Sequence, residues 1–487
     1  MYKSVDFVYL GYYILWPMSI IEQLEAAGEV LSFRVRATLE VLEAAVPRLE
    51  ERIRELEAQL RRNSTNSSKP PSSDPPGVVR RSKKATGKKR GGQKGHPGHH
   101  RKRIAAERVD TVLVHRPHVC EHCAHSLEGT REAKPAQVHQ VVELPEIRAE
   151  VTEHRMLCVR CPGCRKLTRA KLPAQVGGKH FGPRLVALGT LLNGQYRLSR
   201  RGLKDLLGKL LDVPGPSLGS TEAFTQETSA ALKPVHDEAW VEVRRSASAH
   251  VDETSWKLAG MKHWLWVAVT ARATLFHLGP GRGSEELLRF LGPGYGGVTV
   301  SDRWSAYQIC RWRQLCWAHL VRNFEELGLR GGKAVQFSEA GMALCRQVFT
   351  LWRSLQEATL SREELRVQIE PVRTCMRHLL EQGAASGEKR VAGFCRNVLK
   401  LWPWLWTFVE EPVDPTNNAA ERALRPAVLW RKGSFGNQSE TGLRYAERVL
   451  TFTSTCRQLN THPIDFLSRA IFALRSGTAI PRLVPAN

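Results

Sequence analysis

Two stretches of the sequence, HVDETSW (residues 250–256) and VTVSDRWSAY (residues 298–307), decide the fold that we expect for the C-terminal half of the chain. Each reads as a β-strand that ends at a carboxylate, Asp252 in the first and Asp302 in the second. Two further strands, HWLWVAVTA and ATLFHLGPG, follow the first stretch, and a helix, SEELLRFL, precedes the second. A last strand leads into the helix of RQLCWAHLVRNFEEL.

The order of these elements, βββαβαβ, is that of a ribonuclease H-like fold, in which the first and fourth strands are neighbours. We therefore expect Asp252 and Asp302 at adjacent strand ends, where they can share one divalent ion and recruit a second. Two ions about 3.5–4 Å apart stabilise the attacking and leaving oxygens of an in-line phosphoryl transfer. Oxygen ligands favour Mg²⁺ or Mn²⁺ for such a site.

A third carboxylate is expected from a helix that crosses the same edge of the sheet. Glu421 in NNAAERALR is our candidate, and its spacing from Asn417 places both on one helix face. Residues 334–411 break the α/β pattern and read as an all-helical insertion with a capping box at Ser361 and Glu364. Four other acids compete for the role of Glu421: Glu253, Glu285, Glu410 and Glu411.

The charge of the chain indicates a polyanionic partner. The 487 residues include 72 Lys+Arg against 48 Asp+Glu, a net charge of +24. A hydrophobic fraction of 42% excludes wholesale disorder, and no apolar run is long enough to suggest a membrane span. Residues 61–103 hold fourteen Lys/Arg and one acid, so they read as a flexible basic tether for nucleic acid. The cations assigned to DNA there are Arg80, Arg81, Lys83, Lys84, Lys88, Lys89, Arg90 and Lys94.

A heptad pattern of apolar residues precedes the tether. Alternating steps of four and three, the a/d spacing of a coiled-coil seam, separate Val35, Leu39, Leu42, Val46, Leu49, Ile53, Leu56 and Leu60. Two interpretations stay open: a zipper that joins two copies of the chain, and an amphipathic helix packed on its own chain. Pro47 either kinks this helix or begins a new one. Residues 1–17 are apolar but short, and Met18 is an alternative start.

The eleven cysteines are an odd number and do not suggest a set of disulfide pairs, which favours a reducing, cytosolic compartment. Two CxxC pairs supply four thiolates on turns, which suit one tetrahedral structural zinc ion. These four ligands are Cys120, Cys123, Cys161 and Cys164. Cys158 is an additional thiol that could replace one of them, and His122 and His125 are weaker candidates. Residues 138–159 are rich in valine and alternate, so we expect strands between the two pairs and a zinc-binding β unit.

Residues 179–245 are leucine-rich and read as short helices. Arg197, Arg200 and Arg201 could make this unit a second DNA-contacting element, but we favour plain connecting helices. A further helix is expected around residues 463–476.

Seven motifs, in order along the chain, resemble those of the insertion sequence 66 transposase family. RRNSTNSSKPPSSD (61–74) is similar to its asparagine/serine/proline motif, and KRGGQKGHPGHHR (89–101) to its glycine-rich basic motif. The paired CxxC sequences, with ELPEIRAEVTEHR (143–155) between them, resemble its zinc-binding domain. Four motifs resemble its catalytic core: HVDETSW (250–256), VTVSDRWSAY (298–307), CWAHLVRNFEEL (316–327) and NNAAERALRPAVLWRKGSFGN (417–437). The resemblance spans about residues 35–475.

The resemblance implies a DDE transposase of a bacterial insertion sequence, with the acids at Asp252, Asp302 and Glu421. Two Mg²⁺ or Mn²⁺ ions would bind these acids, and one structural Zn²⁺ the cysteines. Such an enzyme cuts at the ends of its mobile element to free a 3′-hydroxyl, which then attacks target DNA. The implied partners are DNA, a homo-oligomer formed through the N-terminal helix and small accessory proteins, in the bacterial cytoplasm at the nucleoid.

Several arginines near the predicted core are candidates for binding DNA phosphates: Arg322, Arg422 and Arg425, with Arg431 nearby. His319 could face the same site, whereas the tryptophans at 317, 402, 404 and 406 are expected to be core. Two other functions remain open. One is a zinc-containing DNA-binding protein or an inactive transposase relative, and the other is a nuclease that cuts DNA without joining it.

The expected organisation is multidomain α+β. An uncertain N-terminal segment, a coiled-coil helix and a basic linker come first, then a zinc-binding domain and a helical linker or DNA-binding unit. A ribonuclease H-like DDE catalytic domain, with its helical insertion, and C-terminal helices complete the chain. The corresponding residues are 1–34, 35–62, 63–104, 105–178, 179–245, 246–445 (insertion 334–411) and 446–487.

Overall fold

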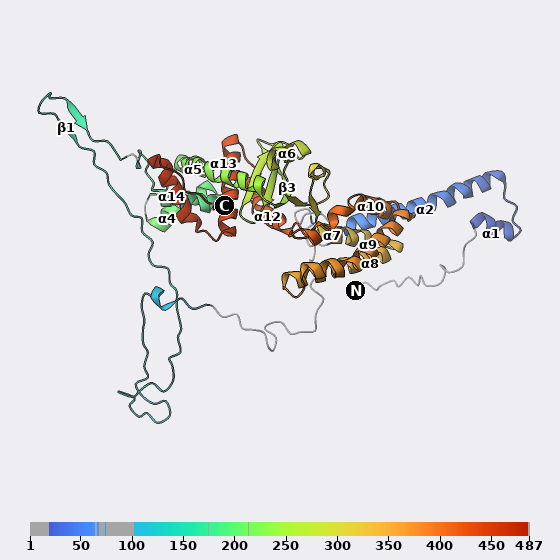
Figure 1. The fold of residues 1–487 in the computed structure, drawn as a ribbon, viewed down its shortest axis with the longest axis horizontal. Helices are drawn as coiled ribbons and strands as arrows, with labels where there is room; N and C mark the ends of the chain where they lie inside the picture. Colours follow the sequence, from blue (N-terminus) through green and yellow to red (C-terminus); the bar gives the residue numbers. More distant parts are fainter. Residues whose placement is uncertain are drawn as a thin grey trace, which may run out of the picture.

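The computed structural model describes residues 19–63, 66–67, 74, 102–173, 175–212 and 214–485. The basic tether and residues 1–17 therefore lie outside the described residues, apart from a few positions at the edges of the tether. Helices and one main sheet make up a mixed α/β structure (Figure 1). Within the described part of the chain, no helix is long and apolar enough to cross a membrane.

The main sheet has five strands in the order β5-β4-β3-β6-β7. Three strands that follow one another in the sequence pair antiparallel: β3 (Ser248–Leu258), β4 (Met261–Val269) and β5 (Thr274–Gly279). The last two, β6 (Val298–Ser301) and β7 (Arg313–Leu315), pair parallel, with β6 beside β3. This confirms that the first and fourth strands are neighbours. The helix expected between the fourth and fifth strands is the short 3-10 helix η3 (Ser305–Ile309).

The hairpin between β3 and β4 follows from its turn residues. Leu258 pairs with Met261, which leaves Ala259 and Gly260 as a two-residue loop, and both have positive φ (49° and 80°). That combination matches the right-handed twist of the strands, and glycine adopts it without strain. The turn thus fixes the register of β3, the strand that carries Asp252.

Helices cover both faces of the sheet. On one face, α5 (Leu218–Arg245) and α6 (Ser284–Leu291) pack against Val251 and Trp266. On the other face, α12 (Asn418–Ser434) and α13 (Glu440–Gln458) pack against Trp256 and Phe276. Because successive side chains of a strand point to opposite faces, Asp252 lies on the same face as Trp256, the face that α12 covers.

A helical insertion extends from the β7 edge of the sheet (Figure 1). It contains α8 (Lys333–Gln356), α9 (Arg362–Ala385), α10 (Lys389–Lys400), η4 (Trp402–Leu405) and α11 (Thr407–Glu410). With α7 (Trp317–Gly328), these helices enclose one apolar core that includes Trp317, Trp402 and Trp406, and Trp404 packs against it, as the sequence predicted. The predicted capping box of Ser361 and Glu364 is present at the start of α9.

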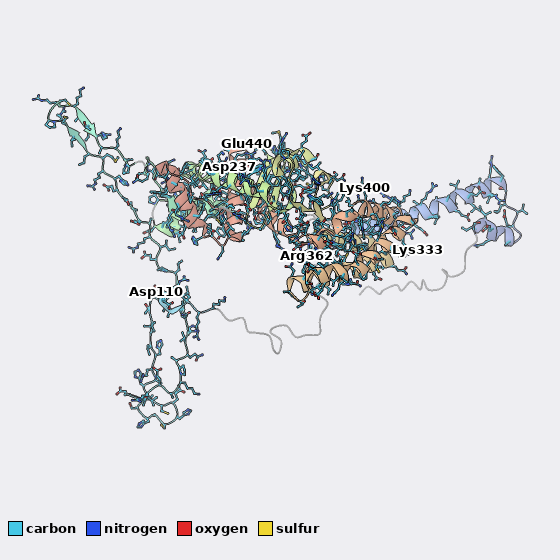
Figure 2. All side chains as sticks on the ribbon, viewed as in Figure 1. Asp110, Asp237, Lys333, Arg362, Lys400 and Glu440 are labelled. Carbon is cyan, nitrogen blue, oxygen red and sulfur yellow. The ribbon has the colours of Figure 1, made fainter. Side chains whose placement is uncertain are left out.

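Polar contacts join the last part of the insertion to α9 and to the sheet. Arg362, at the start of α9 (Figure 2), donates from Nη1 to the carbonyls of Phe408 and Val409 at 2.8 and 3.0 Å. The Gln314 amide in β7 donates to the carbonyl of Leu405 at 3.1 Å. The end of the insertion therefore returns to β7.

The helical unit before the sheet and the C-terminal helices pack into one cluster. Helices α3 (Pro183–Gly194), α4 (Arg200–Leu211) and α5 precede the sheet, and α13 and α14 (Pro463–Ser476) follow it. Phe224, Leu232, Phe452 and Phe466 share one core, and Arg475 pairs with Glu227 through two contacts of 2.9 Å. Helix α13 also runs across the boundary expected at residues 445–446.

The N-terminal region forms α1 (Ile20–Ala26) and α2 (Phe33–Arg61). Helix α2 continues through Pro47, so no new helix begins there. Most of its predicted seam is exposed, as for Leu49 at 62% and Leu60 at 86%. Its contacts with its own chain include the buried Ala58 and two ion pairs: Arg330 with Glu51 at 2.8 Å, and Arg62, just after the helix, with Glu326 at 3.0 Å. A zipper with a second copy stays a prediction.

The strands expected between the CxxC pairs are largely absent from the described residues. Only β1 (Cys158–Arg160) and β2 (Leu167–Arg169) form there, as a short antiparallel hairpin, and η2 (Ala106–Arg108) precedes them. Residues 138–157 form no strand, although their sequence alternates as expected. Their valines are exposed instead of buried, as for Val141 at 79% and Val151 at 78%. The expectation was wrong because alternation does not supply a neighbouring strand, and a β-strand needs one to satisfy its backbone hydrogen bonds.

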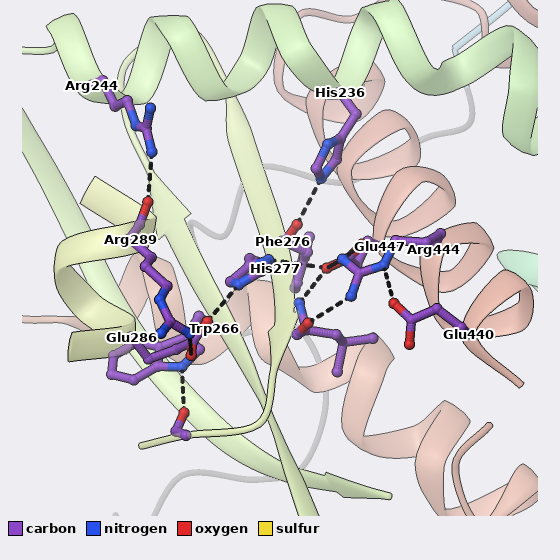
Figure 3. A network of polar contacts seen from close by, with 12 residues as sticks. His236, Arg244, Trp266, Phe276, His277, Glu286, Arg289, Glu440, Arg444 and Glu447 are labelled. Carbon is purple, nitrogen blue, oxygen red and sulfur yellow. Dashed lines mark hydrogen bonds and ion pairs between the residues drawn. The ribbon is translucent and has the colours of Figure 1, made fainter. Parts of the chain in front are cut away.

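A buried polar network holds β5 between α6 and α13 (Figure 3). His277 lies between two carboxylates, with Nε2 2.8 Å from Glu286 and Nδ1 3.1 Å from Glu447. Glu447 also accepts hydrogen bonds from Arg444 at 2.7 and 2.6 Å. Arg444 reaches outward to the exposed Glu440 at 2.7 Å. The buried carboxylates are thus paired, which is the condition for tolerating charge in a core.

Replacing Glu447 with alanine should destabilise the fold by about 3–5 kcal/mol, because His277 and Arg444 would lose a buried partner. The matched control is Glu440→Ala, which removes the exposed partner of the same arginine and should cost less than about 1 kcal/mol. Urea unfolding of both variants measures the difference. Equal losses would show that the buried carboxylate has no special role.

Candidate active site

The register of β3 and β6 places the first two candidate acids together. His250 pairs with Val300 in the parallel ladder, so continuing the register by two residues sets Asp302 opposite Asp252. Neighbouring strands lie about 4.7–4.9 Å apart. Asp302 follows the last residue of β6, and its Oδ1 accepts a hydrogen bond of 2.8 Å from the backbone N–H of Trp304. Asp302 thus follows the end of β6, and Asp252 lies beside it on the neighbouring strand. The prediction that the first strand ends at Asp252 was wrong, because β3 continues to Leu258 through its pairing with β4.

Glu421 lies in the first turn of α12, and Asn417 fixes where that turn begins. The buried Asn417 side chain donates to the Val251 carbonyl at 2.8 Å, one residue before Asp252. Its backbone N–H donates to Cys316 Sγ at 3.1 Å. The backbone N–H of Trp317 donates to Pro415 O at 2.9 Å. The start of α12 is thereby attached both to β3 and to the start of α7.

The three carboxylates act on one another electrostatically. The pKa of Asp252 is raised well above its ordinary value, first by burial, then by the charge of Glu253 and, after a lowering hydrogen bond from the Glu253 N–H, by Asp302 and Glu421. Negative charge is thus concentrated where water is scarce. A divalent cation would relieve this repulsion, and carboxylate oxygens are the donors that Mg²⁺ or Mn²⁺ prefers. The residues therefore fit the metal ions that the sequence predicted, with Asp252, Asp302 and Glu421 as ligands.

Helix α7 supplies the groups around Glu421. Arg322 Nη2 donates to Glu421 Oε1 at 2.9 Å, and His319 Nδ1 lies 3.6 Å from the same oxygen. Burial and the charge of Arg322 lower the pKa of His319, which favours the neutral ring. Burial raises the pKa of the Cys316 thiol to about 11. His319 thus faces the site, and Arg322 is paired with the third acid.

Glu253 is excluded from the role of third acid. It follows Asp252 on β3, so its side chain points to the opposite face of the sheet. There it accepts a hydrogen bond from Arg282 Nε at 2.7 Å and another from the Tyr307 hydroxyl. Arg282 in turn stacks on Trp304, with 4.0 Å between its guanidinium carbon and the ring centroid. Sequence reasoning missed this cluster, although the alternation of β3 was enough to separate Glu253 from Asp252.

The arginines of α12 divide into two kinds. Arg422 and Arg425 are exposed, and within the described residues neither has an ion pair. Arg431 instead donates to the hydroxyl of Ser255 at 2.7 Å and so holds α12 on β3. Arg422 and Arg425 are therefore available to a polyanion beside Glu421. The tether cations from Arg80 to Lys94 lie outside the described residues.

The two CxxC sequences form turns of the same geometry. The N–H of Cys120 donates to His125 O at 2.9 Å, and the N–H of Cys161 donates to Lys166 O at 2.8 Å. Four residues after each of these cysteines, Ala124 and Arg165 have positive φ (53° and 56°). Backbone N–H groups of the turn point at the first thiol of each pair and lower its pKa. Both turns are thus shaped to hold a thiolate.

The structure does not bring the two CxxC turns together. Among the described residues, one group of three or more His, Cys, Asp or Glu has its ligand atoms within 4.8 Å of one another, and it is not formed by these cysteines. Cys123, Cys158 and Cys164 are exposed. A shared zinc ion at Cys120, Cys123, Cys161 and Cys164 therefore remains a prediction, as does the choice between Cys158 and the other thiols.

Asp252→Asn should make the magnesium-free protein more stable at high pH. A carboxyl group with a raised pKa costs stability where it is ionised, and this cost disappears as the pH falls below that pKa. Thermal unfolding should show a gain of about 1–2 °C at pH 8, equivalent to about 1 kcal/mol, that shrinks toward pH 4. The control Asp237→Asn removes an exposed carboxylate of α5 and should show no such trend (Figure 2). A less stable Asp252→Asn protein at pH 8 would contradict the electrostatic reading.

Two family models match the chain. Residues 218–445 match the transposase IS66 family, and residues 18–102 match a family of unknown function, DUF6444. Two uncharacterized proteins of Sinorhizobium fredii (strain NBRC 101917 / NGR234) are similar in sequence. The protein y4qI is 29% identical over 46% of this chain and 47% of its own length. The protein y4hP is 24% identical over 74% of this chain and 71% of its own length.

The chain thus spans about half the length of the first of these relatives. The IS66 match covers the whole sheet, the helical insertion and α12, including the three candidate acids. Over residues 218–445, slightly under half of its length, the chain therefore matches the IS66 family of transposases.

Proposed function

We propose that the protein is a DDE transposase that cuts DNA at the ends of an insertion sequence and joins them to target DNA. The observation that carries this proposal is the meeting of Asp252, Asp302 and Glu421 at one edge of the sheet. The family match supports the same activity. Both steps are in-line displacements at phosphorus, with water as the nucleophile in the first and a DNA 3′-hydroxyl in the second.

The three carboxylates would hold two Mg²⁺ or Mn²⁺ ions. Such ions position the attacking and leaving oxygens and neutralise the charge that develops on them. The protein's own contribution is to fix the ligands. The β3–β6 ladder sets the spacing of Asp252 and Asp302, and the Asn417 hydrogen bond sets the position of Glu421. Because the scaffold is rigid, little reorganisation is needed when DNA enters.

Basic groups would hold the DNA substrate. Arg422 and Arg425 are exposed on the helix that carries Glu421, so they can contact phosphates on either side of the scissile bond. The tether would bind DNA more loosely and without sequence preference. Arg322 pairs with Glu421 and would be released to a DNA phosphate when a cation binds the acid.

The N-terminal half would assemble the complex. One Zn²⁺ ion bound by the two CxxC turns would join two otherwise separate loops, and the exposed seam of α2 would pair with a second copy of the chain. Small accessory proteins of the same element are further expected partners. The site of action would be the nucleoid in the bacterial cytoplasm.

Asp302→Asn should reduce cleavage of DNA that carries the element's ends by more than about 100-fold while DNA binding persists. Even partners that only contact metal ligands usually contribute 10–100-fold, so loss of a ligand should exceed this. Asp237→Asn is the control, since it removes an exposed carboxylate away from the site. Full cleavage by the Asp302→Asn protein would refute the assignment.

The same assay separates the alternative functions. Joined products in magnesium support a transposase, and cut but unjoined DNA supports a nuclease. DNA binding without cutting by the parent protein supports an inactive or purely DNA-binding relative.

The double variant Arg422→Ala and Arg425→Ala should weaken DNA binding and reduce its salt dependence. Each lost phosphate contact should lower the slope of log affinity against log salt by about 1. Arg373 and Arg377 on α9 provide a control pair, because they are ion-paired within the insertion. Titrations at several salt concentrations measure the slope, and an unchanged slope would exclude Arg422 and Arg425 from the DNA interface.

Cys164→Ser should lower the zinc content of the full chain by one ion, because it removes one ligand of the predicted site. Cys375→Ser is the control, since Cys375 is exposed on α9 and far from both CxxC turns in sequence. Metal analysis after dialysis measures the content. If Cys158→Ser lowers it and Cys164→Ser does not, Cys158 is the ligand.

A further inference from the structure

Three potential metal-binding side chains meet at the start of α7. Cys316 caps this helix, His319 lies in its first turn, and Glu421 approaches from α12. One ligand atom from each, the thiol sulfur, an imidazole nitrogen and a carboxylate oxygen, lies within 4.8 Å of the other two. Among the described residues, these three form the one group of His, Cys, Asp or Glu side chains whose ligand atoms all lie within 4.8 Å of one another. Its donors are softer than the oxygens of Asp252 and Asp302.

Backbone N–H groups point at the sulfur of Cys316, but burial still raises the pKa of this thiol to about 11, so only a bound cation would make it a thiolate. The sulfur is buried and accepts the backbone N–H of Asn417 at 3.1 Å. The backbone N–H groups of Ala318 and His319 also point at it from the first turn of α7. Several N–H groups directed at one sulfur stabilise negative charge, and such hydrogen bonds commonly surround sulfur ligands of metals.

His319 offers an unused nitrogen. Its Nδ1 is buried and has no hydrogen-bond partner within the described residues, because Glu421 Oε1 at 3.6 Å is too far. Orphaned nitrogens of this kind are rare in folded proteins and call for an explanation. An ion placed between Nδ1, the sulfur and the carboxylate oxygen would satisfy all three.

We propose that Cys316, His319 and Glu421 bind a thiophilic divalent ion such as Zn²⁺, and that this ion withdraws Glu421 from the catalytic acids. The inhibition rests on the proposed function, whereas the binding does not. Thiolate and imidazole select Zn²⁺ over Mg²⁺, so the two ions would compete for Glu421 while each has its own other ligands. The thiol proton passes to solvent as the sulfur–metal bond forms.

Arg322 is the group that this ion must displace or share. Its guanidinium donates to Glu421 Oε1 at 2.9 Å, and its Nε has no partner among the described residues. A cation at Cys316 and His319 would repel Arg322 and take over its carboxylate. Arg322→Ala should therefore strengthen zinc binding, a result that a purely structural role for the cluster does not predict.

Zinc binding to the purified full chain tests the proposal without any measurement of activity. The protein is titrated with Zn²⁺ in magnesium-free buffer against a chromophoric chelator, and the number of tight ions per chain is counted. Cys316→Ala and His319→Ala should each bind one ion fewer than the parent. Cys345→Ala is the matched control, because it removes a buried thiol of α8 that belongs to no ligand cluster. Circular dichroism verifies that each variant is folded.

A full complement of zinc in both folded variants would overturn the proposal. If a variant fails to fold, the conservative change His319→Gln keeps the site testable, since an amide is a poor zinc ligand. The inhibitory effect is read as the ratio of cleavage in magnesium with and without micromolar zinc. In the parent, cleavage with zinc should be at most about one tenth of cleavage without zinc. In His319→Gln the two should be nearly equal. Absence of cleavage by the parent would refute the proposed function but leave the zinc count unaffected.

Discussion

The hydrogen bond from Asn417 to the Val251 carbonyl is the contact on which the candidate active site depends. Asp252 and Asp302 are brought together by neighbouring strands, so the sheet alone fixes them. Glu421 comes from a helix that begins only after the long helical insertion, and no ladder constrains it. Asn417 supplies that constraint, because it fastens the start of α12 to β3 one residue before Asp252. Its burial removes competing water and makes the loss of this bond costly.

The insertion can be large because most of its core comes from its own helices. Its tryptophans and leucines pack among α7 to α11 and against Val298, Val300 and Leu315 of β6 and β7, whereas β3, β4 and β5 pack against α5, α6, α12 and α13. The two cores meet at β7 and at the start of α7, where Cys316 and Trp317 contact the segment that leads into α12. Helix α7 thus belongs to the insertion core by its apolar face and to the active site by His319 and Arg322.

The sequence allowed prediction of the sheet, because alternating strands and a two-residue turn determine register locally. It also offered Asp252, Asp302 and Glu421 as candidate acids, and their proximity follows from strand order and a single helix start. Contacts between distant residues could not be predicted in this way. Nothing near Arg322 reveals that it pairs with Glu421, a residue 99 positions away. The prediction of strands in residues 138–157 was wrong for the same reason, since an alternating sequence forms a strand only where a partner strand exists.

The placement of charge explains why the acids stay poised for metal. The charges of Asp252, Asp302 and Glu421 repel one another, so their arrangement is unfavourable without a cation. Arg322 relieves part of it by binding Glu421, but the described residues offer no such cation to the side chain of Asp252, whose bond comes from a backbone N–H. A protein with a neutral site would bind divalent ions weakly, and one with every acid paired to arginine would exclude them. If the site binds divalent ions as proposed, pairing only the acid that arrives on a helix leaves the two strand acids available to the first ion.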